Sequence, residues 1–154
     1  MENHFDKGCQ RLCDQIDYQF RDEELLELAL THKSFTEFES KTGERNNEKL
    51  EFLGDAVLDM AISELLMERF PELDEGGLSK FRASLVNEDG LAHIARKMKL
   101  GDSLRMGRGE DLSGGREKPS LLADALEAVL AAIYLDSRKT EGFSRVSKII
   151  YDLY

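Results

Sequence analysis

The chain has 154 residues, of which 31 are acidic and 21 are basic, so its formal net charge is −10. Its length suits one domain, and its shares of hydrophobic (41%) and charged (34%) residues are those of a globular protein. No apolar stretch reaches the roughly 18 residues that cross a bilayer, and the first residues lack a signal peptide's pattern. We therefore expect no membrane span and a cytoplasmic location. Taken alone, the acidity also argues against a nucleic-acid partner.

Apolar residues recur at helical spacing along most of the chain, without the sustained period-two runs that are typical of strands. Pro71 ends the longest such segment, because proline disfavours helical geometry in the residue before it. Asn87 is the expected N-cap of a later helix, with acidic residues in its first turn. The pattern predicts an all-α protein with a single domain over residues 1–154. The expected helices cover residues 5–16, 23–30, 48–70, 78–86, 88–98, about 119–136 and about 141–153.

Residues 100–118 break the helical pattern. They contain five glycines and several basic residues, so we expect a mobile loop there. The charge is also unequally divided, because residues 1–75 carry a balance of −12 and residues 76–154 a balance of +2. This polarity predicts one surface for cations and another that can meet anions, which weakens the argument against a nucleic acid.

The start of the long helix carries three carboxylates, Glu48, Glu51 and Asp55. In a helix these side chains fall within about 60° of one another on one face. Gly54 lies between the last two, although glycine costs roughly 1 kcal/mol relative to alanine in a helix interior. We therefore expect a close approach at Gly54 and a function at this turn. The alternative is a solvated acidic face.

Asp124 and Glu127 are the only charged residues between positions 121 and 135. Carboxylates in such apolar surroundings are costly unless a cation neutralises them, and this segment offers no basic residue. Carboxylates from two packed helices make an oxygen-rich site that suits Mg²⁺ or Mn²⁺. The alternative for this pair is a helix surface whose charges pair with the basic residues of positions 100–118.

Four blocks of the sequence, in order, resemble the ribonuclease III family. Residues 47–58 (NEKLEFLGDAVL) resemble the signature of its endonuclease domain, and residues 28–34 (LALTHKS) resemble its early helix. Residues 75–87 and 118–128 resemble its later blocks. The resemblance covers nearly the whole chain and implies an all-helical homodimer that hydrolyses double-stranded RNA with Mg²⁺, for which Mn²⁺ substitutes.

The resemblance also implies roles for individual residues. Glu48, in the outer acidic position, is expected to assist RNA cleavage or dimer contacts. Phe52 resembles the family's dimer-interface aromatic, and the alternative for it is an ordinary core residue. The catalytic carboxylates that would hold the metal are Glu51, Asp55, Asp124 and Glu127.

For the reaction, the resemblance implies 5′-phosphate and 3′-hydroxyl ends, with short 3′ overhangs where a dimer cuts both strands. It also implies a role in processing rRNA and mRNA precursors. Selectivity for RNA is expected to come from A-form shape and 2′-hydroxyl contacts. Each basic residue between positions 100 and 118 is a candidate for contact with the RNA backbone, the alternative being a solvated loop charge. These residues are Arg105, Arg108, Arg116 and Lys118.

Bacterial members with this signature usually continue into a double-stranded-RNA-binding domain, for which the chain leaves no room after its last expected helix. We therefore expect an isolated catalytic domain that cuts RNA but binds it weakly and in a salt-sensitive way. Two other classes stay open. One is an all-α, Mg²⁺-dependent nucleotide pyrophosphohydrolase, and the other is a dimer that binds duplex RNA or a partner protein without cutting.

Overall fold

The structure, a computed structural model, describes residues 3–154, so the first two residues of the domain predicted over 1–154 lie outside it. Within this range the chain is helical and forms no strand, apart from an isolated bridge between Thr31 and Arg105. The predicted fold class is confirmed. No helix within residues 3–154 has the length and apolar character needed to span a membrane. The elements are α1 (His4–Ile16), α2 (Glu23–Ala29), α3 (Glu48–Arg69), α4 (Glu75–Leu85), α5 (Glu88–Lys97), η1 (Leu100–Ser103), α6 (Arg108–Leu112), η2 (Gly115–Glu117), α7 (Pro119–Ser137) and α8 (Phe143–Leu153).

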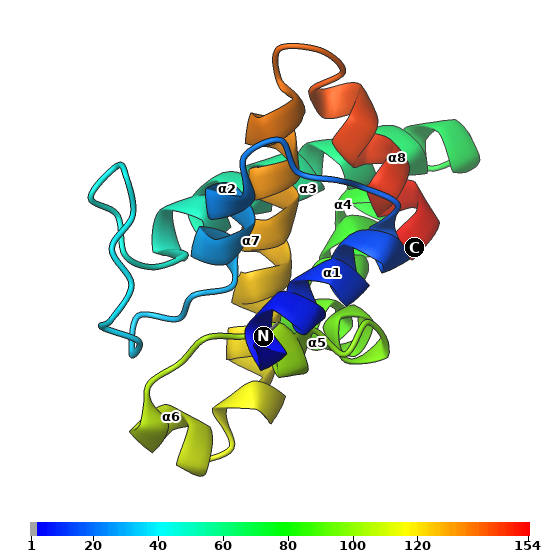
Figure 1. The fold of residues 1–154 in the computed structure, drawn as a ribbon. Helices are drawn as coiled ribbons and strands as arrows, with labels where there is room; N and C mark the ends of the chain where they lie inside the picture. Colours follow the sequence, from blue (N-terminus) through cyan, green and yellow to red (C-terminus); the bar gives the residue numbers. More distant parts are fainter. Residues whose placement is uncertain (1–2) are drawn as a thin grey trace.

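Helix α7 is the centre of the fold, and Figure 1 shows it upright in the middle with the other helices around it. Between Leu122 and Ile133 every residue of α7 except Asp124 is buried. Helix α3 crosses α7 so closely that a Cβ atom on Gly54 would lie 1.8 Å from the backbone oxygen of Glu127. Only glycine fits at this crossing, which confirms the predicted close approach.

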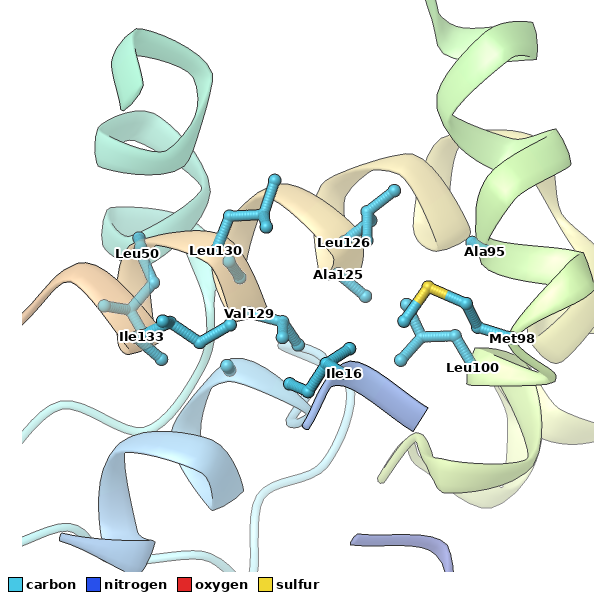
Figure 2. Packing of buried hydrophobic residues seen from close by; sticks show 14 of the residues in the cluster. Ile16, Leu50, Ala95, Met98, Leu100, Ala125, Leu126, Val129, Leu130 and Ile133 are labelled. Carbon is cyan, nitrogen blue, oxygen red and sulfur yellow. The ribbon is translucent and has the colours of Figure 1, made fainter. Parts of the chain in front are cut away.

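The hydrophobic core gathers side chains from distant parts of the chain onto α7. Figure 2 shows Ile16 of α1, Leu50 of α3 and Met98, at the end of α5, among the buried residues around Val129 and Leu130. Full burial of a side chain of this size stabilises the fold by about 1.5–3 kcal/mol. The core therefore fixes the position of the helix that carries Asp124 and Glu127.

Helix α4 begins earlier than the sequence predicts. The expected start was residue 78, after the pair Gly76-Gly77, but the helix begins at Glu75. The side chain of Asp74 caps it by accepting a hydrogen bond of 2.8 Å from the N–H of Gly77. The glycine pair is thus part of the first turn, where an N-cap can satisfy a free backbone N–H group.

Residues 100–118 form η1, α6 and η2, so the predicted loop is wrong as a description of this segment. Leu100, Leu104 and Met106 are buried and anchor its first part in the core. The backbone of Arg105 also donates to the oxygen of Leu30 and accepts from the N–H of His32, each at 2.8 Å. The many glycines concealed this anchoring, because their turn signal outweighs three separate apolar residues.

Candidate metal centre

The start of α3 is held to the chain after α2, which places its carboxylates. The N–H of Asn47 donates to the oxygen of Thr31 at 3.0 Å, and its side-chain amide donates to the oxygen of Ala29 at 3.1 Å. Asn47 itself is buried, so these bonds replace contacts with water. The next turns of α3 then leave Glu51 half-buried and Asp55 exposed.

Glu51 of α3 and Asp124 and Glu127 of α7 come together where the two helices cross. Each offers a carboxylate oxygen, and these oxygens lie within 4.8 Å of one another. We call these three residues the acidic centre. The close crossing at Gly54 brings the two helices near enough for this arrangement.

No ion pair neutralises the acidic centre among residues 3–154, although the charges of His32 and Lys33 act on Asp124 from nearby. Glu127 is only 7% exposed. Burial first, and then the charges of Asp55, Glu51 and others, raise its pKa from the ordinary 4.5 to about 8. Burial and neighbouring carboxylates also raise the pKa of Glu51 and that of Asp124. Within residues 3–154 none of the three side chains makes an ion pair or a hydrogen bond.

These properties fit a divalent metal ion. Buried carboxylates without a counter-charge are costly, and they are stabilised by a cation that accepts several oxygen ligands. The donor set contains carboxylate oxygens alone, which hard ions such as Mg²⁺ and Mn²⁺ prefer. Glu51, Asp124 and Glu127 are the residues that could hold such an ion directly.

The other two predicted carboxylates, Asp55 and Glu48, do not belong to the acidic centre. Asp55 is outside the set of three converging oxygens, yet its charge is the first that raises the pKa of Glu127. It therefore lies beside the centre, and its role as a metal ligand stays a prediction. Glu48 is exposed and lies 3.6 Å from the ammonium of Lys33.

Two further carboxylates near the centre were missed from the sequence. Burial and the charge of Asp55 raise the pKa of Asp59, while Arg82 of α4 acts in the opposite direction. The charge of Glu88, the first residue of α5, raises the pKa of Asp124. Asp59 follows Asp55 by one helical turn, so the spacing could have revealed it. Glu88 depends on how α5 packs against α7.

Most of the basic residues predicted to contact RNA have partners within the fold. The guanidinium of Arg105 lies 3.9 Å from the ring centre of Phe5 and 3.4 Å from a carboxylate oxygen of Glu27. Arg116 donates to the oxygen of Leu104 and pairs with Asp111 at 2.9 Å.

Lys118 pairs with Glu110. Arg108 is exposed, and it makes no ion pair or side-chain hydrogen bond within residues 3–154. We call residues 105–118 the basic segment. Contact with RNA stays a prediction for its four cations, and Arg108 is the best placed of them.

Phe52 is 80% exposed on α3, so the alternative of a core residue is wrong. Ala56, Met60 and Met67 are exposed at the spacing that continues the same face of the helix. An exposed apolar stripe of this kind on a monomer marks an interaction surface.

The fold and the site define a class, namely all-helical proteins in which carboxylates from two crossing helices converge and could hold a metal ion. Residues 22–153 match the family model described as ribonuclease-III-like. The chain belongs to the ribonuclease-III-like family.

Individual relatives agree with this assignment. "Ribonuclease 3" of Caldanaerobacter subterraneus subsp. tengcongensis is 51% identical over 140 residues, which cover 91% of this chain and 59% of that protein. "Ribonuclease 3" of Pelotomaculum thermopropionicum is 54% identical over 125 residues, which cover 81% of this chain and 52% of that protein. The chain therefore spans between half and three-fifths of the length of these relatives.

Among solved structures, the nuclease domain of ribonuclease III from Campylobacter jejuni is similar to this chain with a TM-score of 0.85 and 46% identity. The match covers 94% of each chain. That structure concerns flexibility in a region involved in dimer formation. The fold of this chain is thus the fold of a ribonuclease III nuclease domain.

Proposed function

We propose that this chain is a metal-dependent endoribonuclease that hydrolyses phosphodiester bonds of double-stranded RNA. The observation that carries the proposal is the convergence of Glu51, Asp124 and Glu127, none of which forms an ion pair within the part of the chain that the structure describes. Membership of the ribonuclease-III-like family supports the reaction class. The proposed ion is Mg²⁺, with Mn²⁺ as a substitute, and the proposed setting is the processing of rRNA and mRNA precursors in the cytoplasm.

A bound Mg²⁺ would supply a water of lowered pKa and stabilise charge on the departing 3′ oxygen. The chain's own part is to hold carboxylate oxygens in fixed positions, because α3 and α7 cross without space for rearrangement at Gly54. Asp55 is proposed as a further ligand, and Glu48 as an outer carboxylate that assists cleavage. The carboxylates also accept the proton that the attacking water loses. The products are 5′-phosphate and 3′-hydroxyl ends.

We also propose that the chain acts as a homodimer through the α3 face that carries Phe52. This face lies on the same helix as Glu51, so dimerisation fixes two acidic centres relative to one another. Two centres, each cutting one strand, would leave the short 3′ overhangs that the sequence predicts. Arg108 is proposed to contact the RNA backbone beside the cut.

The test is incubation of a long RNA duplex with the wild type, Glu127→Gln and Asp55→Asn, each with and without Mg²⁺. We expect Mg²⁺-dependent cutting to short duplexes, and a loss of at least about a hundredfold in rate for either variant. Glu117→Gln serves as the control, because Glu117 is an exposed carboxylate of η2 that is not one of the three converging groups. Sedimentation of both variants should match that of the wild type.

Other outcomes would refute the proposal. Equal cutting by all three proteins would remove the acidic centre from the reaction. Duplex binding without cutting by the wild type at low salt would identify a binding module. Hydrolysis of free nucleoside triphosphates in place of duplex RNA would identify a nucleotide pyrophosphohydrolase.

A further inference from the structure

A cavity of about 350 Å³ opens beside the acidic centre and shares Asp124 with it. Its walls come from four parts of the chain, one of which is α6 with Glu110. His32 and Lys33 follow α2, Glu48 begins α3, and Lys118 and Ser120 lie at the start of α7. The cavity therefore combines cationic and neutral donor groups next to the place where a metal is proposed to bind.

The hydrogen bonds around His32 fix which ring nitrogen carries the proton. The N–H of Ser34 donates to Nδ1 of His32 at 3.2 Å, so Nδ1 is an acceptor. The hydroxyl of Ser34 accepts from the N–H of Gly107 at 2.8 Å, which leaves its own proton for Nδ1, also at 2.8 Å. The proton of the neutral ring is therefore on Nε2. Nε2 has no hydrogen-bond partner among the residues that the structure describes.

Two lysines and a helix start add positive character to the cavity. Lys33 is well exposed and forms an ion pair of 3.6 Å with Glu48. A surface ion pair of this kind is weak, so a stronger anion can displace Glu48. Lys118 uses its ammonium for Glu110 and for the hydroxyl of Ser113 and keeps a third donor. Helix α7 starts at Pro119 without a side-chain cap, so the N–H of Ser120 lies unsatisfied at the positive end of a long helix.

The cavity also contains three carboxylates, whose negative charges would oppose the binding of an anion. Glu48 and Glu110 each balance one lysine. Asp124 belongs to the acidic centre, and a divalent cation bound there would neutralise it. Burial is the largest influence on the pKa of His32 and lowers it, whereas the charge of Glu110 acts in the opposite direction. The lowered pKa favours the neutral ring with its Nε2–H donor. With a cation in the centre, the remaining unpaired groups of the cavity are donors.

We propose that this cavity binds a phosphate group, and that the group is the backbone phosphate next to the one that is cut. The ligand accepts hydrogen bonds from Nε2–H of His32, from the two lysines and from the start of α7. A tetrahedral phosphate has oxygens for several donors at once, which suits a cavity whose donors lie on two facing parts of the chain, after α2 and at the start of α7. The choice of an RNA phosphate rests on the proposed function, whereas the phosphate site itself does not.

The first test is an NMR titration of protein with ¹⁵N-labelled histidine against inorganic phosphate, with and without Mg²⁺. The chain has three histidines, and His4 and His93 are exposed and act as internal controls. We expect phosphate to shift and saturate the Nε2 signal of His32 alone, and to bind more tightly with Mg²⁺. Lys33→Gln should weaken this binding about fivefold, and Lys33→Gln with Lys118→Gln more strongly.

Lys80→Gln is the matched control, because Lys80 is an exposed lysine of α4 outside the cavity. It should leave the titration unchanged. The proposal is overturned if the three histidines respond alike, or if the double lysine variant binds phosphate as the wild type does.

The second test places an uncharged methylphosphonate next to the cut site of an RNA duplex. This change should lower kcat/KM about tenfold for the wild type and have little effect for Lys33→Gln with Lys118→Gln, because the contact is already lost. An equal loss in both proteins would assign the phosphate contact elsewhere. A response of His32 to phosphate without any RNA cleavage would refute the proposed function but leave the phosphate site standing. RNA cleavage without a response of His32 to phosphate would refute the phosphate site but leave the proposed function standing.

Discussion

The acidic centre and the basic segment are both rich in charge, but their charges are met in opposite ways. Glu51, Asp124 and Glu127 gather like charges with no cation among them, and the pKa of each is raised. In the basic segment, by contrast, Arg105 and Arg116 are each held by a carboxylate and by other groups of the fold. Unmet charge marks a place where a ligand is needed, whereas satisfied charge serves the fold.

The largest effect on stability is expected for Gly54, at the helix crossing beside the acidic centre, and it is compared with Gly109 in the basic segment. In Gly54→Ala the new Cβ would clash with the backbone of Glu127, and backbone cannot move aside as a flexible side chain can. We expect a loss of about 3 kcal/mol or more in the free energy of unfolding, measured by urea denaturation. In Gly109→Ala the new Cβ would meet nothing within 4 Å beyond its own helix and chain neighbours, so this change should be neutral or slightly stabilising. Equal effects would show that the crossing is not tight.

The second comparison concerns two exposed apolar residues. Phe52 beside the acidic centre and Leu112 in the basic segment are 80% and 77% exposed. If the α3 face forms the dimer, Phe52→Ser should raise the dimer dissociation constant about a hundredfold or more, which is about 2.7 kcal/mol. Leu112→Ser should leave it unchanged. Analytical ultracentrifugation measures both, and a dimer lost only with Leu112→Ser would move the interface to α6.

The third comparison is between two arginines of the basic segment. Arg105→Ala removes a guanidinium that lies against Phe5 and pairs with Glu27, and we expect a loss of about 2 kcal/mol in stability. Arg108→Ala should change stability by less than about 0.5 kcal/mol, because its side chain is exposed. The same variant should weaken RNA binding at low salt. A stable Arg105→Ala protein would contradict the structural role given to this residue.

The smallest expected effect is a pH dependence of stability in metal-free protein. The pKa of Glu127 is raised from 4.5 to about 8, so between these values the folded chain holds a proton that the unfolded chain releases. Stability from the protonated group is complete below about pH 4.5 and is lost as pH rises through about 8. We expect a fall of about 2 kcal/mol between about pH 6 and pH 7.5, because one pKa unit corresponds to about 1.4 kcal/mol. Thermal unfolding of wild type and Glu127→Gln tests it, since the variant should lack this component.

Much of the fold and of the centre could be predicted from the sequence because the local signals are strong there. One turn of α3 combines a glycine with like charges, and the otherwise apolar middle of α7 carries two charges. Both patterns destabilise an isolated helix, so they indicate that the two helices meet at a functional site. The basic segment could not be predicted in this way. Whether Arg105 faces solvent or a cluster of aromatic rings depends on the packing of α1 against residues far along the chain. The tautomer of His32 likewise depends on the hydrogen bonds of Ser34, whose hydroxyl is oriented by the distant N–H of Gly107.

The central claim is that the acidic centre binds a divalent metal ion, and a titration with Mn²⁺ followed by electron paramagnetic resonance tests it most directly. Wild type and Glu117→Gln should bind Mn²⁺ with the same affinity, and binding near pH 7 should release a proton because Glu127 must ionise. Glu127→Gln should lose at least about tenfold in affinity together with the proton release. Unchanged Mn²⁺ affinity in Glu127→Gln, in a protein that remains folded, would contradict the account.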